Sequence, residues 1–167
     1  EVTGATLGIV GLGRTGRAVA QRARGFEMRV LYTRSKPDDD PAYRSLDKLL
    51  GQSDIVTLHV PLTDETRGFM DARRPALMRD GACLVNTSRG QVVDEPALVA
   101  ELVSGRLRAG LDVFANEPHV PPELFELDNV VMTPHLGTAT EGTREAMTRS
   151  PLAAEGAPPH ELAGEAG

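Results

Sequence analysis

The chain has 167 residues, enough for one domain with a sizeable core but short for two, and it lacks the roughly 20 consecutive apolar residues of a membrane span. Its net charge of −6 provides no basic surface for a phosphate backbone, which argues against nucleic acid and favours a small-molecule partner. The single cysteine, Cys83, excludes an intrachain disulfide and a cysteine zinc cluster, and without a leader segment we expect a soluble cytoplasmic protein with no metal site.

Six short apolar runs alternate with segments of helical pattern along the chain. The runs are continuous rather than alternating, which is typical of strands that are covered on both faces. Their spacing accommodates crossover helices, so the pattern predicts an α/β fold with a doubly wound parallel sheet. The predicted strands are Thr6–Val10, Met28–Tyr32, Ile55–Leu58, Cys83–Asn86, Ala109–Asp112 and Val130–Thr133. The predicted helices are Arg14–Arg24 with Gly25 as its stop, a short helix from the cap Ser45 through Leu50, and Glu95–Val103 between the cap Asp94 and Gly105.

A glycine-rich loop directly follows the first strand and opens the first helix. It reads Gly11-Leu12-Gly13-Arg14-Thr15-Gly16. Gly11 permits a tight turn, Gly13 lets a pyrophosphate approach the backbone, and Gly16 lets the helix pack closely on the strand. The N–H groups that open the helix then face the phosphates. An ordinary glycine turn is the alternative, but the strand before the loop and the helix after it favour a Rossmann-type dinucleotide-binding domain.

The end of the second strand carries no acidic residue to accept a hydrogen bond from a ribose 2′-hydroxyl. The sequence there is Tyr32-Thr33-Arg34-Ser35-Lys36. An arginine at this place pairs with a 2′-phosphate, and Ser35 adds a hydroxyl, so the prediction favours NADP(H) over NAD(H). In the alternative interpretation, which allows NAD(H), Arg34 is a solvated loop charge and Asp38, Asp39 or Asp40 takes the role of the acid.

Several motifs follow one another in the second half of the chain. They are the stretches Ser53–Gly68, Leu84–Gly90, Gly110–Phe114, Asn116–Pro118 and Thr133–Gly137. In this order and spacing the chain resembles the D-isomer-specific 2-hydroxyacid dehydrogenases, and the resemblance runs from about Gly4 to Met147. The last motif, continued by Thr143, Arg144 and Met147, is most similar to glyoxylate and hydroxypyruvate reductases.

The resemblance implies a catalytic set. Arg89 would hold the substrate's carboxylate and carbonyl oxygen, His135 would be the general acid–base, and Glu117 would be its paired acid. Asp112 would hydrogen-bond the nicotinamide side. The further positions assigned to the cofactor, largely through backbone, are His59, Pro61, Thr63, Thr87, Ser88 and Gly137.

The chemistry of keto-acid reduction calls for these residue types independently of the family. Hydride addition to carbon leaves negative charge on oxygen, so the site must supply a proton and a cation. A carboxylate beside a histidine favours the imidazolium, and arginine binds a planar carboxylate with two hydrogen bonds. Seen alone, each residue has a structural alternative: His135 as a capping or surface residue, Arg89 and Glu117 as solvated charges, Asp112 as a turn cap.

We therefore expect an oxidoreductase domain that transfers a hydride between NAD(P)H and a small 2-keto acid or 2-hydroxy acid. One alternative is a nucleotide-sensing binding module, as in the transcriptional corepressors that share this fold. Another is a nonfunctional gene fragment. The resemblance also implies a homodimer.

The resemblance implies a second, substrate-binding domain that is largely missing from this sequence. Such a domain is built from segments on either side of the nucleotide-binding domain. We place the nucleotide-binding domain at residues 1–149. Pro75 departs from the family pattern, and residues 150–167, rich in Pro, Ala, Gly and Glu, predict a disordered tail. We expect the isolated chain to bind cofactor weakly and to turn over little, because closure of two domains normally excludes water from such a site.

Overall fold

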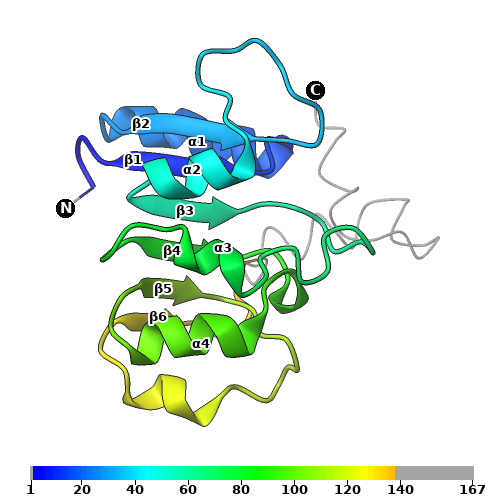
Figure 1. Ribbon diagram of the computed structural model, residues 1–167, viewed down its shortest axis with the longest axis vertical. Coiled ribbons are helices and arrows are strands. Elements are labelled where there is room, and N and C mark those ends of the chain that lie inside the picture. Colours follow the sequence, from blue (N-terminus) through cyan, green and yellow to red (C-terminus); the bar gives the residue numbers. More distant parts are fainter. Residues whose placement is uncertain (1, 138–167) are drawn as a thin grey trace. The chain divides into compact units, whose positions relative to one another are not determined.

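Six parallel strands form one sheet in the order β2-β1-β3-β4-β5-β6 (Figure 1). All six predicted strands are present, but β2, β5 and β6 differ from the prediction by one residue at one or both ends. The ladder between neighbours decides these ends: Asn86 pairs with Leu111, so Asp112 falls beyond the strand. The strands are β1 (Thr6–Val10), β2 (Arg29–Thr33), β3 (Ile55–Leu58), β4 (Cys83–Asn86), β5 (Arg108–Leu111) and β6 (Val130–Met132).

The computed structural model describes residues 2–137. The chain divides into two units, Glu1–Thr133 and Pro134–Gly167, and each is described by itself. The predicted tail at 150–167 and the motif residues Thr143, Arg144 and Met147 lie outside the described residues. Within the described part, no helix has the length and apolar character needed to cross a membrane.

Helices cover both faces of the sheet. The helix α1 lies on one face, whereas α2, α3 and α4 lie on the other (Figure 1). Neighbouring residues of β1 show the division: a Cβ on Gly8 would come within 2.6 Å of Leu49 in α2, whereas Ile9 lies beside Gly16 in α1. The larger cluster of buried side chains, including Leu49, lies on the side of α2–α4, and the smaller one, including Ile9, lies under α1. The helices are α1 (Arg14–Gly25), α2 (Leu46–Gln52), α3 (Arg73–Ala76) and α4 (Glu95–Val103), with the 3₁₀ turns η1 (Gly90–Val92) and η2 (Pro122–Glu126).

The predicted helix ends are partly confirmed. Asp94 caps α4 as predicted, because its carboxylate accepts a hydrogen bond of 3.1 Å from the Ala97 N–H. The predicted stop of α1 is wrong: Gly25 is still helical, and the left-handed residue is Glu27, with a φ of 56°. Ser45 precedes α2 but makes no capping bond with its side chain, and the helix runs two residues beyond Leu50.

One feature has no counterpart in the prediction, and another concerns Pro75, the residue that departs from the family pattern. Tyr43 forms a single parallel bridge with Tyr32, where Rossmann sheets of strand order 3-2-1-4-5-6 have a further edge strand. Pro75 lies inside α3, a helix of only four residues, where it is the third residue. A proline is tolerated there because the first turn of a helix has no acceptors for its N–H groups.

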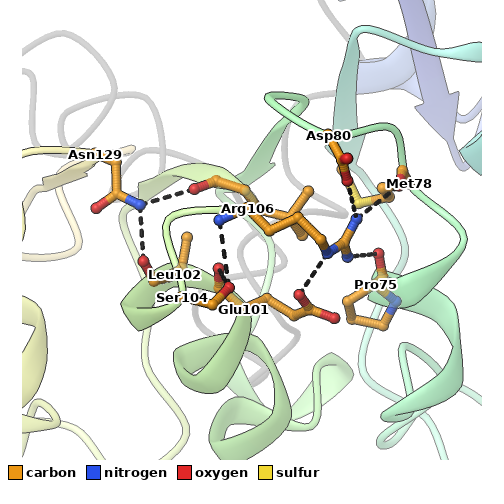
Figure 2. Close-up of polar contacts among 9 residues, drawn as sticks. Pro75, Met78, Asp80, Glu101, Leu102, Ser104, Arg106 and Asn129 are labelled. Carbon is orange, nitrogen blue, oxygen red and sulfur yellow. Dashed lines mark hydrogen bonds and ion pairs between the residues drawn. The ribbon is translucent and has the colours of Figure 1, made fainter.

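Arg106 joins three segments at the edge where the strands begin (Figure 2). Its Nε donates to Glu101 Oε2 at 2.6 Å, its Nη2 to the Pro75 carbonyl at 2.6 Å, and its Nη1 to the Met78 carbonyl at 2.8 Å. Asn129 closes the same corner by donating to the carbonyls of Leu102 and Leu107.

Arg106→Ala is expected to lower the free energy of unfolding by about 2 kcal/mol, because carbonyls of the α3 segment and the Glu101 carboxylate lose a charged donor. Urea denaturation measures the change. Arg73→Ala is the matched control, since its ion pair with Asp47 joins two side chains that are 55% and 51% exposed. Such pairs contribute little. Equal stability of the two variants would contradict a structural role for Arg106.

Candidate functional site

The predicted site residues of the first unit lie beyond the carboxyl ends of the strands. Because the strands are parallel and Val10, Leu58 and Asn86 are paired in register, these ends meet at one edge of the sheet. The chain passes from β1 to β2 on one side and then to β3 on the other, which makes a switch point between β1 and β3. The residues at this edge are Gly11–Gly16 after β1; Arg34 and Ser35 after β2; His59, Pro61 and Thr63 after β3; Thr87, Ser88 and Arg89 after β4; and Asp112 and Glu117 after β5.

The glycine loop has the geometry of a phosphate cradle. Gly11 adopts a φ of +96°, and a Cβ there would lie 2.6 Å from the His59 carbonyl oxygen. A Cβ on Gly16 would lie 2.1 Å from the Gly11 carbonyl oxygen, whereas one on Gly13 would meet nothing within 4 Å. The helix α1 begins here without a side-chain cap or an acidic residue in its first turn, so its opening N–H groups suit a pyrophosphate.

Arg34 and Asp38 form an ion pair after β2. Asp38 Oδ2 lies 2.5 Å from Arg34 Nη2, and the Arg34 Nε donates to the Lys36 carbonyl at 3.1 Å. Arg34 and Ser35 are both exposed. Burial, and then the hydrogen bond to Asp38, raises the pKa of Tyr32 to about 12. Desolvation raises the pKa of Asp38, but this effect is outweighed by hydrogen bonds from Tyr32 and the Asp40 amide and by the charge of Arg34. The pKa of Asp38 is therefore lowered.

The loop after β3 is closed largely by its own contacts. His59 donates its backbone N–H to the Val10 carbonyl at 2.7 Å, and its Nε2 lies 3.0 Å from Thr57 Oγ1. Burial lowers the pKa of His59. The Thr63 hydroxyl donates to Glu65, and the Pro61 carbonyl accepts from Thr66, so these groups shape the loop itself.

Asn86 organises the loop that carries Arg89. This residue is 1% exposed; its Nδ2 donates to the Arg89 carbonyl, and its Oδ1 accepts from both the backbone N–H and the hydroxyl of Ser88. Arg89 is exposed and donates from Nη1 to the Ser88 carbonyl at 2.7 Å. Thr87 is exposed. The buried amide therefore fixes the backbone from which the Arg89 side chain extends.

The loop after β5 is held against the loop after β4. A Cβ on Gly90 would lie 1.9 Å from the Phe114 carbonyl carbon, so the two backbones are in direct contact. Gln91 donates to the Ala115 carbonyl, and Glu95 accepts from the Ala115 N–H, both at 2.8 Å. The structure thus brings together the segments that carry Arg89 and Glu117.

Asp112 and Glu117 have different surroundings within the β5 loop. Asp112 is buried and accepts a hydrogen bond from the Thr133 hydroxyl at the end of β6. Glu117 is exposed, and its Oε1 accepts from the Phe114 N–H at 3.0 Å. His135 and Gly137 belong to the second unit; His135 is exposed, with a left-handed φ of 54°.

Sequence reasoning missed several residues that shape this site. The side-chain contacts of Asn86, Gln91 and Glu95 were not predicted, and Thr133 was not linked to Asp112. One signal was available: an asparagine at the last position of a strand commonly hydrogen-bonds the turn that follows.

The chain is similar to proteins of known family. Residues 1–137 match the family described as D-isomer specific 2-hydroxyacid dehydrogenase, NAD binding domain. A glyoxylate reductase of Pyrococcus furiosus is 49% identical over 154 residues, which are 88% of this chain and 46% of that protein. The chain therefore spans about half the length of this curated relative.

Solved structures agree with this similarity. One is an NADPH-dependent glyoxylate/hydroxypyruvate reductase from Sinorhizobium meliloti in complex with NADP and malonate, with a TM-score of 0.84 and 36% identity over 89% of this chain and 48% of that one. Another is a D-lactate dehydrogenase from Aquifex aeolicus complexed with NAD and lactic acid, with a TM-score of 0.77 and 37% identity over 84% and 49% of the two chains. Proteins of this shape thus include one solved with NADP and one with NAD.

Proposed function

The chain belongs to the D-isomer specific 2-hydroxyacid dehydrogenase family, in which it is the NAD binding domain, and we propose that it serves a reductase of small 2-keto acids. The observation that carries this proposal is the arrangement at one sheet edge. The glycine cradle lies after β1, and the segments bearing Arg89 and Glu117 are held together after β4 and β5. The names of the relatives favour glyoxylate or hydroxypyruvate as substrate.

Each residue of the proposed site has one task. The loop Gly11–Gly16, with the start of α1, would hold the pyrophosphate, and Asp112 would hold the nicotinamide side. Bound NAD(P)H supplies the hydride for the keto carbon. Arg89 binds the substrate's carboxylate and carbonyl oxygen, and His135 donates a proton to that oxygen. Glu117 is proposed as the acid paired with His135, as the family resemblance implies.

The reaction is tested by following NAD(P)H oxidation at 340 nm with the complete gene product. We expect glyoxylate or hydroxypyruvate to be reduced, and we expect the 167-residue chain alone to turn over little. Absence of turnover of either acid by the complete gene product, with both cofactors, would overturn the proposal.

We further propose that NADP(H) is the preferred cofactor, because Arg34 follows β2 where a 2′-phosphate would lie and no acid occupies the strand end. Arg34→Ala is expected to weaken NADP⁺ binding about 10- to 100-fold, as expected for the loss of hydrogen bonds to a charged group, and to leave NAD⁺ binding unchanged. Calorimetric titration of the chain measures both. Arg24→Ala, an exposed arginine in the last turn of α1, is the control. A clear preference of the unaltered chain for NAD⁺ would contradict the proposal.

We also propose that the protein works as a cytoplasmic homodimer. The family resemblance supports the dimer, and the single cysteine suits a reducing compartment. Light scattering on the complete gene product measures the assembly, and a monomeric mass at micromolar concentration would contradict it.

A further inference from the structure

Asp38 is the acid that lies against the Arg34 guanidinium. Three consecutive aspartates follow Arg34, and their side chains have different surroundings. Asp38 forms the ion pair of 2.5 Å with Arg34. The Asp40 carboxylate instead accepts from the Ala42 N–H at 2.7 Å, and Asp39 is exposed. Among the described contacts of these three aspartates, therefore, only Asp38 forms an ion pair with Arg34.

A buried tyrosine fixes the position of this carboxylate. The Tyr32 hydroxyl donates to both oxygens of Asp38, at 2.9 and 2.8 Å, and the Asp40 N–H donates to Oδ1 at 3.0 Å. Tyr32 is 6% exposed, and its ring packs edge-on against Tyr43 with centroids 6.0 Å apart. Because the phenol is held by the sheet, the carboxylate is fixed where it meets the guanidinium.

The guanidinium is held as well. Its Nε donates to the Lys36 carbonyl at 3.1 Å, while Nη2 faces Asp38. A 2′-phosphate that pairs with Arg34 must therefore share this cation with a carboxylate already in place. The phosphate carries about −1.5 to −2 charges near neutrality, so it is repelled by a neighbouring carboxylate. A 2′-hydroxyl is neutral and is not repelled.

We propose that Asp38 sets the cofactor selectivity of this domain by sharing Arg34 and so limiting its preference for a 2′-phosphate over a 2′-hydroxyl. The inference rests on the proposed role of Arg34 and makes Asp38 a specificity-determining residue. Removing the charge of Asp38 leaves Arg34 with its full positive charge for the phosphate. An asparagine is the appropriate substitute, because its Oδ1 still accepts from the Tyr32 hydroxyl.

The experiment compares two nucleotides that differ at the 2′ position. The full chain and Asp38→Asn are titrated by calorimetry with adenosine 2′,5′-bisphosphate and with 5′-AMP at one fixed salt concentration. Asp38→Asn is expected to raise the ratio of the two affinities about tenfold in favour of the bisphosphate, through removal of one like charge at close range. Asp39→Asn removes the same charge without the contact and is expected to change the ratio less than twofold.

Each outcome bears on the inference. An unchanged or lower ratio in Asp38→Asn overturns it, as does an equal rise in Asp39→Asn, which would indicate a general effect of net charge. If both nucleotides bind the unaltered chain, either of these two results overturns the inference about Asp38 but leaves the proposed function intact. If neither nucleotide binds, the proposed function is contradicted and this inference fails with it. Melting temperatures equal to that of the unaltered chain verify that both variants are folded.

Discussion

The variant Gly90→Ala is expected to unfold with a free energy about 3 kcal/mol lower than that of the unaltered chain. The added Cβ would lie 1.9 Å from the Phe114 carbonyl carbon, 2.1 Å from its oxygen and 2.4 Å from the Ala115 nitrogen. All three are backbone atoms, so no rotamer change relieves the clash. The loops after β4 and β5 must separate, which breaks the hydrogen bonds between Ala115 and Gln91 and Glu95.

Urea denaturation measures this loss, and the chain offers a matched control. Gly25→Ala adds the same methyl group at the last residue of α1, where a Cβ meets nothing within 4 Å. Because alanine favours the helical backbone, we expect that variant to be as stable as the unaltered chain, or more stable by up to about 1 kcal/mol. If Gly90→Ala and Gly25→Ala unfold at the same urea concentration, the contact between the two loops is not tight.

His135→Ala, made in the complete gene product, is expected to lower kcat for keto-acid reduction by about 10²–10⁴-fold through loss of the general acid. The affinity for the cofactor should change less than twofold, since the proposed task of His135 is proton donation. Absorbance at 340 nm gives kcat, and calorimetry gives the cofactor Kd.

His119→Ala is the control for this prediction. His119 is exposed in the turn after Glu117, and its described hydrogen bond is made by its backbone N–H to Asn116. We expect this variant to keep full activity. If His135→Ala is as active as an active unaltered enzyme, His135 is excluded as the proton donor. If neither the unaltered protein nor His135→Ala reduces a keto acid, a nucleotide-sensing module is favoured.

Much of the fold could be predicted because local pattern and overall fold agree along most of the chain. Continuous apolar runs such as Thr6–Val10 indicate buried parallel strands, and the glycines after the first run indicate the turn that follows. The strand ends could not be predicted as well, because pairing with a neighbour decides them. The bridge at Tyr43 and the four-residue helix α3 are too short to leave a periodic pattern.

The location and residue types of the site could be predicted, but the contacts that hold its loops in place could not. Glycine, arginine and acidic residues at strand ends indicate where a ligand lies, since that edge carries the loops that follow the parallel strands. The contacts that hold these loops join residues that are distant in sequence, such as Gln91 and Ala115, and no local pattern records them. The roles of Arg89, Glu117 and His135 stay predictions that the variants above test.

The segment after β2 has a consequence for how such an enzyme can evolve. The side-chain hydrogen bonds described for Arg34, Asp38 and Asp40 join them to one another and to near neighbours, within residues 32–42. Arg89 and Glu117 lie instead on loops fastened to each other across β4 and β5. Under the proposed roles, mutations that alter cofactor selectivity can therefore accumulate within residues 32–42, apart from the loops that carry the residues proposed for catalysis. The proposed cofactor preference and the proposed chemistry are then free to change independently of each other.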